Sequence, residues 1–322
     1  MRYTRLLSLG IVLILALTVA GLAEAKLNYP TKPVEMIVAY PAGGGMDVTF
    51  RVLAKHAEKY MGQKLVVLNK VGGGGVIGNA EIAKSKPDGY TIGCIPANIA
   101  SDEFTIKGLP YSYKDFIPVV QVGADPHVLV IKNALNMDFK QFVEYVRKNP
   151  SKVSMSMGGT WNSHDFFRAK LEKALGIKFL RMPYQGGAPA VQAVAGGHID
   201  CSTPHVSEVL PSLEGKMVTP IALSDVVRAP QIPNVPTVKE LGCDAIQLNW
   251  RMATLPPGTP QEIIDFVEAA FTKAYQEPEF QSDLRKAGGF PVYRNHKDAA
   301  KYYQEEYDRY KALAKDLGIE PK

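Results

Sequence analysis

The chain has 322 residues, a formal net charge of +5, and 46% hydrophobic residues. This length suits two α/β domains better than one. The positive charges are spread along the chain, without the basic run or interleaved aromatic residues that a nucleic-acid partner requires, so we expect no nucleic-acid partner.

The first 25 residues have the features of a secretory signal peptide. Arg2 and Arg5 give a positive start, and the apolar run Leu6–Leu17 is too short to span a bilayer comfortably. Ala23-Glu24-Ala25 is an A-x-A cleavage site, and no cysteine for a lipid anchor lies near it. We therefore expect an exported protein whose mature chain begins at Lys26.

A glycine-rich loop separates the first predicted strand from the first predicted helix. Val34–Tyr40 reads as a buried strand, and Asp47–Met61 carries apolar residues at helical spacing. The loop between them, Pro41–Gly45, has no Lys or Arg, so an anion held there is held by backbone N–H groups at the positive end of the helix dipole. The alternative is a tight turn without a ligand. Asp47 fits a dipole and capping role, and contact with an ammonium group of a ligand is its alternative.

Strand and helix signals then alternate through the first two thirds of the chain, which predicts parallel sheets covered by helices on both faces. Capping boxes are predicted from Asp138 with Gln141 and from Thr259 with Glu262. From Pro260 onward we expect helices and no further strand. The predicted helices are Phe139–Asn149, His164–Leu175 and Pro260–Gln276, and the predicted strands are Lys64–Asn69, Thr91–Pro96, Val119–Gly123, Val128–Lys132, Val153–Met157, Lys178–Pro183, Ile199–Thr203 and Met217–Ser224.

Three cysteines remain in a chain that we expect to enter an oxidising compartment. Cys94 and Cys201 lie in apolar, strand-like runs and are predicted to be buried as small hydrophobic residues. An odd number cannot all pair internally, and the sequence leaves open whether any two of them, with Cys243, form a disulfide.

Several enzyme motifs are incomplete. Gly73–Gly78 satisfies G-x-G-x-x-G, but the strand Thr91–Pro96 ends without the acidic residue that a dinucleotide ribose requires, so we expect no cofactor. Ser163-His164-Asp165 contains the residue types of a hydrolase triad, but sequence neighbours point in different directions and cannot form the relay. The six histidines show no metal-ligand spacing. We therefore expect no catalytic residue and no metal site.

Small or glycine-rich turns follow several predicted strands. Ligands of parallel sheets bind beyond the carboxyl ends of strands, so these turns are predicted to meet at one cleft. They are Pro41–Gly45, Gly72–Gly75, Ala97–Ser101, Met157–Ser163, Gln185–Gly187 and Thr203–His205.

A series of motifs, each weak alone, occurs in the order of a known family. Together they resemble the periplasmic solute receptors of tripartite tricarboxylate transporters, the Bug family. The matching segments include Tyr40–Asp47, Val67–Lys70, Gly73–Gly78, Pro87–Thr91, Asp115–Val119, Pro183–Gly186, Gly197–Asp200, Pro233–Thr237 and Pro256–Pro260.

The resemblance implies an α/β fold of the two-lobed, type II periplasmic binding protein kind, with mostly parallel sheets flanked by helices. Lobe 1 would take residues 26–122 plus 252–322, and lobe 2 residues 123–251. The protein would be a monomer that captures a small organic carboxylate and delivers it to the large and small membrane subunits of the transporter. A sensory receptor that presents its ligand to a signalling protein is one alternative, and an exported hydrolase is another.

The resemblance also implies where the ligand binds. The loop Pro41–Gly44 would hold one end of the carboxylate, and Ser156–His164, at a helix N-terminus, the other. This chain departs from the family pattern at Thr160, which replaces a glycine, and at Trp161, where a small hydroxyl residue is usual. That departure leaves open whether the ligand is an aliphatic di- or tricarboxylate, an aromatic acid or an amino acid. The predicted ligand-binding residues are Tyr40, Pro41, Ala42, Gly43, Gly44, Ala97, Asn98, Ser156, Gly158, Gly159, Thr160, Trp161, Asn162 and His205.

Overall fold

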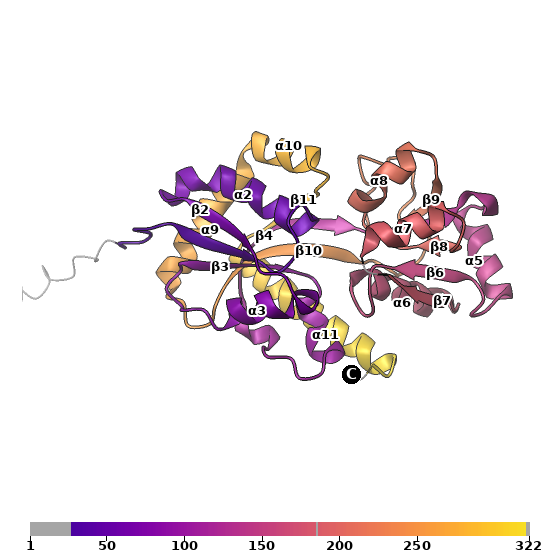
Figure 1. The fold of residues 1–322 in the computed structure, drawn as a ribbon, viewed down its shortest axis with the longest axis horizontal. Helices are drawn as coiled ribbons and strands as arrows, with labels where there is room; N and C mark the ends of the chain where they lie inside the picture. The colour runs from indigo at the N-terminus through magenta and orange to yellow at the C-terminus, as the bar shows by residue number, and fades with distance from the viewer. Residues whose placement is uncertain (1–26, 185, 320–322) are drawn as a thin grey trace, which may run out of the picture.

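The computed structural model describes residues 27–184 and 186–319, which form two α/β lobes, each built on one β-sheet (Figure 1). The predicted signal peptide, Lys26 and Gln185 lie outside the described residues. Among the residues described, no helix combines the length and the apolar character needed to cross a membrane.

The first sheet has six strands in the order β11-β4-β10-β3-β1-β2. β1, next to the edge strand β2, is parallel to both β2 and β3, whereas β10 is antiparallel to β3 and β4, and β11 is antiparallel to β4. The bounds are β1 Val34–Val38, β2 Leu65–Asn69, β3 Thr91–Pro96, β4 Ile117–Pro126, β10 Leu248–Leu255 and β11 Pro291–Arg294.

Helices cover both faces of the first sheet because alternate residues of β1 face opposite sides. Met36 packs with residues of α2, α9 and α10, while Ile37 packs with residues of α3, α4 and α11. The bounds are α2 Gly45–Met61, α3 Val76–Ala83, α4 Ile99–Thr105, α9 Gln261–Gln276, α10 Pro278–Lys286 and α11 His296–Asp316.

The second sheet has five strands in the order β7-β6-β8-β5-β9. Here β6 is parallel to β7 and β8, while β5 is antiparallel to β8 and β9. Residues of α5 and α6 pack on one face, and residues of α7 and α8 on the other. The bounds are β5 Val128–Lys132, α5 Phe139–Lys148, β6 Ser154–Met157, α6 Ser163–Leu175, β7 Leu180–Pro183, α7 Gly187–Ala195, β8 Cys201–Ser202, α8 Val206–Glu214 and β9 Val218–Leu223.

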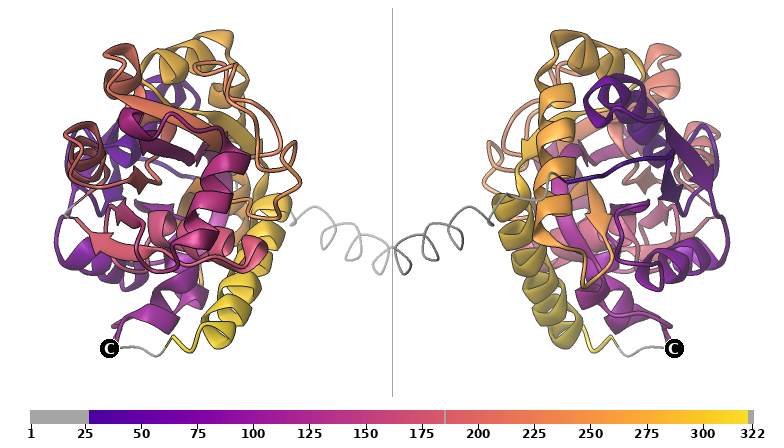
Figure 2. Two further views of the ribbon diagram at one scale, coloured as in Figure 1. Left: turned by 90° about the vertical axis from the view of Figure 1, so that its right-hand side faces the viewer. Right: turned by 90° about the vertical axis from the view of Figure 1, so that its left-hand side faces the viewer.

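Two antiparallel strands connect the lobes. β4 leaves the first sheet, passes through His127 and continues as β5 of the second sheet, while β10 returns beside β4. The C-terminal helix α11, yellow in Figures 1 and 2, extends toward the second lobe, and its Tyr310 ring lies 4.6 Å from the Phe166 ring of α6. The lobe bounds at residues 122/123 and 251/252 stay a prediction.

The two-lobed α/β fold is confirmed, and β3 and β5 have the predicted bounds. The sheets are mixed rather than mostly parallel, because β10, β11 and β5 pair antiparallel with their neighbours. β10 was not predicted, and the expectation of no strand after Pro260 is wrong, since the short edge strand β11 lies there.

One of the two predicted capping boxes is present and the other is not. The capping box of Asp138 with Gln141 is confirmed. The box of Thr259 with Glu262 is wrong, because the Thr259 hydroxyl donates to the Pro256 carbonyl at 2.7 Å and α9 has no side-chain cap. All three cysteines are buried, as predicted for Cys94 and Cys201, and all three are free thiols, which answers the question that the sequence left open.

Candidate functional site

The exposed loop before α2 is held in shape by the buried side chain of Asp47. The Asp47 carboxylate accepts hydrogen bonds from the Gly43 N–H, from Arg51 Nε and from Asn69 Nδ2, each at 2.9 Å. Burial raises the pKa of Asp47, but the hydrogen bonds from Arg51, Gly43 and Asn69 outweigh burial and lower it. The carboxylate is therefore occupied within the first lobe, and the geometry supports the structural role over contact with an ammonium ligand.

The first lobe presents backbone N–H groups at the N-terminus of α2. The N–H groups of Gly43 and Gly44, both predicted to bind ligand, are used inside the loop. Those of Ala42, Gly45 and Met46 have no hydrogen-bond partner within the described part of the chain. They lie at the positive end of the α2 dipole, where an anion is stabilised.

A buried cation lies directly beneath these amides. A Cβ atom added at Gly45 would lie 2.4 Å from Nη2 of Arg251, so position 45 requires glycine for close approach. Arg251 is on β10 and pairs with Asp125 of β4 and with Thr49 of α2. The N-terminus of α2 is thereby attached to the strands that connect the lobes.

Tyr40 and Asn98 lie together beside this loop. The Tyr40 hydroxyl donates to Asn98 Oδ1 at 2.9 Å, and Asn98 Nδ2 donates to the buried carboxylate of Asp102 at 3.2 Å. Asn98 stands at the N-cap position of α4, and Ala97 before it is buried. Of these three residues predicted to bind ligand, Tyr40 and Asn98 are in contact with each other, whereas Ala97 can offer a ligand little beyond its backbone.

The second lobe presents a similar set of amides in the loop before α6. Asn162 caps the helix by accepting the Asp165 N–H at 3.2 Å, and the Asp165 carboxylate accepts the Trp161 N–H at 2.9 Å. The N–H groups of Gly159 and Thr160 have no partner among the residues that the structure describes. Both lobes therefore present backbone donors at a helix N-terminus.

Two residues predicted to bind ligand from this loop, Ser156 and Trp161, have side chains that make contacts within the second lobe. Ser156 is fully buried, and its hydroxyl donates to the Ala190 carbonyl at 2.8 Å, so its side chain lies in the second-lobe interior. Trp161 has a left-handed φ of 54°. Its ring lies 4.3 Å from the Arg181 guanidinium and 5.9 Å from the Phe166 ring, which engages it in packing within the lobe.

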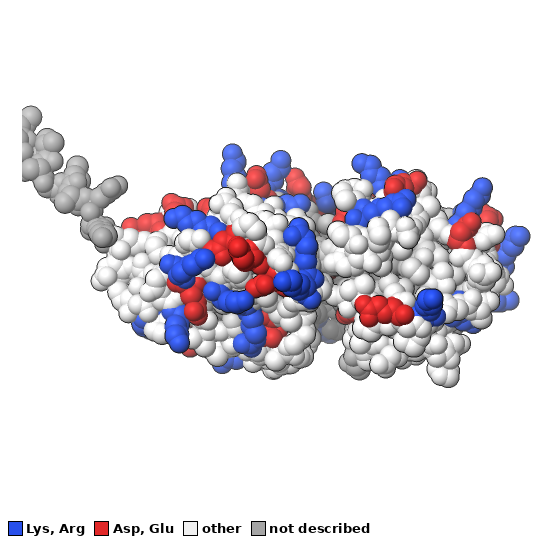
Figure 3. Space-filling view, turned by 90° about the horizontal axis from the view of Figure 1, so that it is seen from above, with Lys and Arg blue, Asp and Glu red and all other residues white. Residues whose placement is uncertain are grey.

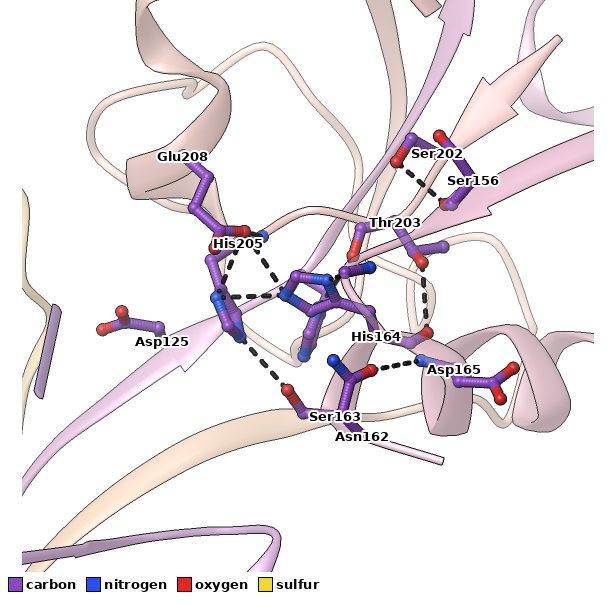
Figure 4. Close-up of polar contacts among 12 residues, drawn as sticks. Asp125, Ser156, Asn162, Ser163, His164, Asp165, Ser202, Thr203, His205 and Glu208 are labelled. Atoms are coloured by element: carbon purple, nitrogen blue, oxygen red, sulfur yellow. Dashed lines mark hydrogen bonds and ion pairs between the residues drawn. The ribbon is translucent and has the colours of Figure 1, made fainter. Parts of the chain in front are cut away.

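His205 belongs to a buried polar cluster that was not predicted from the sequence (Figure 4). Oε2 of Glu208, Nε2 of His164 and Nδ1 of His205 lie 3.3 Å from one another, and Ser163 Oγ lies 3.3 Å from Nε2 of His205. The ring centroids of His127 and His205 lie 4.3 Å apart, with the rings tilted by 42°. Spacing could not reveal this cluster because its members come from the ends of separate elements.

The predicted ligand-binding residues lie apart from two cavities on the surface of the second lobe. Figure 3 shows a notch between the lobes and charges of both signs intermixed on the visible face. Two open cavities of about 510 Å³ each lie on the second lobe, and both are lined by Thr219 and Pro220 of β9. None of the predicted ligand-binding residues lines either cavity, so we place the candidate site at the helix N-termini near the lobe junction.

Two α/β lobes joined by two strands, with helix N-termini at their junction, define a two-lobed solute-binding protein. Residues 49–319 match the family described as tripartite tricarboxylate transporter family receptor, TctC. The chain therefore belongs to this family, and the resemblance stated from its motifs is confirmed.

Individual relatives agree with this assignment. A UPF0065 protein in the tcbD-tcbE intergenic region of Pseudomonas sp. (strain P51) is 31% identical over 86% of this chain and 85% of its own. The protein BugT of Bordetella pertussis is 28% identical, with 100% of both chains covered. The crystal structure of a TctC solute-binding protein from Polaromonas, without ligand, has a TM-score of 0.78 at 29% identity, over 89% of this chain and 99% of that one.

Proposed function

We propose that the protein captures a small organic carboxylate between its two lobes and delivers it to the membrane subunits of a tripartite tricarboxylate transporter. The observation that carries this proposal is the pair of amide sets, Ala42, Gly45 and Met46 in one lobe and Gly159 and Thr160 in the other. A ligand with two carboxylates meets a helix N-terminus at each end without a basic side chain in contact.

Closure of the lobes is the binding mechanism we propose, with lobe 1 as residues 26–122 and 252–322 and lobe 2 as residues 123–251. Rotation about β4 and β10 brings the two amide sets onto one ligand. The ligand selects the closed state because that state alone supplies both sets of donors. Arg251 beneath Gly45 adds positive potential to the first set.

Tyr40, Asn98 and His205 are the side chains that we propose line the ligand. Tyr40 and Asn98 are half-buried and hydrogen-bonded to each other, so the ligand meets a preformed polar wall in lobe 1.

No bond is made or broken in this function. The protein works as a monomer in the periplasm, after cleavage behind Ala25, and intact mass of the exported protein tests that cleavage.

A thermal-shift screen with aliphatic, aromatic and amino acids tests the proposed function. A carboxylate that binds the folded state raises the melting temperature, and above Kd the stabilisation grows with the logarithm of the ligand concentration. We expect at least one carboxylate to stabilise the protein and to be recovered unchanged. A screen without stabilisation, or recovery of a chemically altered compound, would contradict the proposal.

A further inference from the structure

The buried histidine cluster of the second lobe has the composition of a metal site. His127, His164 and His205 each offer a ring nitrogen, and these atoms all lie within 4.8 Å of one another. His127 lies between β4 and β5, His164 lies in the first turn of α6, and His205 precedes α8, so three separate segments bring them together. Figure 4 shows His164 and His205 beside Glu208.

The carboxylate of Glu208 extends the cluster with an oxygen donor. Its Oε2 lies 3.3 Å from Nδ1 of His205, as in a tetrahedral zinc site, where ligand atoms about 2.1 Å from the ion lie about 3.4 Å apart. Oε2 also accepts the backbone N–H of His205 at 2.9 Å, which orients the carboxylate toward the rings.

The hydrogen bonds of the outer nitrogens determine which rings can coordinate. Nδ1 of His127 lies 2.9 Å from the Thr203 carbonyl and must donate to it, so Nε2 keeps its lone pair. That Nε2 is buried and has no hydrogen-bond partner in the described part of the chain. Ser163 Oγ can accept the Nε2 proton of His205, leaving Nδ1 of that ring for a ligand bond.

In His164, unlike in His127 and His205, the ring nitrogen that faces the cluster carries the proton. Its Nδ1 accepts the Gly158 N–H at 2.9 Å, so its own proton is on Nε2, 3.3 Å from Glu208 Oε2. His164 therefore donates to the carboxylate instead of binding the ion. Outer contacts of this kind hold and orient metal ligands in zinc proteins.

We propose that His127, His205 and Glu208 bind a divalent transition-metal ion, with His164, Thr203 and Ser163 orienting these ligands. Two imidazoles and one carboxylate form a ligand set that zinc accepts, with a fourth position for water. The ion would tie α8 to the point where β4 enters the second lobe. It would thus stiffen the second lobe beside the loop that carries Gly158. The site shares His205 with the side chains proposed to line the carboxylate, but it is separate from the amide sets and does not rest on them.

Calorimetric titration of the chelator-treated full chain with zinc chloride tests the proposal. We expect one zinc ion per chain, and at least a 30-fold weaker affinity for His127→Gln and Glu208→Gln. His164→Gln is expected to weaken binding less, because it removes an orienting contact. His198→Gln removes an exposed histidine, and His56→Gln removes a histidine that contacts Glu277 and Asp283 at the opposite lobe; both should bind zinc as the unaltered protein does.

Cobalt(II) absorption of the unaltered protein gives a second measurement that needs no variant to fold. A low-coordinate nitrogen and oxygen site is expected to give intense visible bands, which zinc then removes. The proposal is overturned by the absence of zinc binding, by binding that His127→Gln leaves unchanged, or by loss of binding in His56→Gln or His198→Gln.

Discussion

The carboxylate of Asp47, in the first turn of α2, accepts the backbone N–H of Gly43, four residues earlier, at 2.9 Å. The helix thereby fixes the conformation of the loop that leads into it. Because this bond uses the Gly43 N–H, the nearby amides of Ala42, Gly45 and Met46 are the ones left to meet a ligand.

Replacement of Asp47 by Asn tests this relationship. The amide keeps one oxygen but cannot serve Gly43, Arg51 and Asn69 together, so the loop loses its fixed shape. We expect carboxylate affinity measured by calorimetry to fall about tenfold, roughly 1.4 kcal/mol. Arg51→Ala is the control, since it removes an exposed partner of Asp47 and leaves the Gly43 bond; its affinity should stay within about threefold. Equal effects of the two variants would contradict the role of Asp47.

Gly43 and Gly45 are required for different reasons: Gly43 for its left-handed backbone, and Gly45 for its close approach to Arg251. Gly45→Ala places a methyl group against the buried Arg251 guanidinium, so both unfolding free energy and carboxylate affinity should fall, the former by at least about 2 kcal/mol. Gly43→Ala meets no atom within 4 Å, and its cost is the left-handed φ of 77°, about 1 kcal/mol. Urea unfolding of the two variants measures the difference, and a smaller loss for Gly45→Ala would contradict the close approach of Arg251.

Local sequence signals predicted the loop before α2, because a buried strand, small residues and an amphipathic helix follow one another directly. They did not predict which amides remain unpaired, since that depends on the Asp47 side chain turning back to Gly43. The loop before α6 shows the same limit, as Asn162 and Asp165 occupy some of its amides.

Long-range contacts account for the missed elements. β10 lies between β3 and β4, far from both in sequence, and carries the buried polar residues Arg251 and Thr254 among apolar ones. β11 is short, with every residue half-buried, so it shows no alternation of polar and apolar residues. The histidine cluster joins positions 127, 164 and 205, which no spacing rule connects.

Trp161 is expected to stabilise the second lobe more than it selects the ligand. Its ring packs on Arg181 and Phe166, and such aromatic and cation–π contacts are worth about 0.5–2 kcal/mol each. Trp161→Ser should therefore lower the unfolding free energy by about 1–2 kcal/mol and leave the order of preference among carboxylates unchanged. A reversal of that order in the thermal-shift panel would put the ring in the ligand site.

Asp102 predicts a pH dependence of stability. Burial raises its pKa from 3.8 to about 6, although hydrogen bonds from Tyr111 and Asn98 lower it. The folded state then holds this proton more tightly than the unfolded state, so the contribution is present below about pH 4 and is lost as pH rises through about 6. Between about pH 4.5 and 7.5, the unaltered protein should lose up to about 2 kcal/mol that Asp102→Asn does not lose. Urea unfolding at both pH values compares the proteins, and identical losses would contradict the raised pKa.

The most direct test of two-ended carboxylate capture compares a dicarboxylate with its half-amide and its diamide by calorimetry, using the best dicarboxylate from the thermal-shift panel. An amide keeps the size of a carboxylate but lacks its charge, so it loses the favourable interaction with a helix N-terminus. We expect one site, at least tenfold weaker binding for the half-amide, and a further tenfold loss for the diamide. Equal affinity for the dicarboxylate and the diamide would contradict the proposal that both lobes bind the ligand through its negative charge.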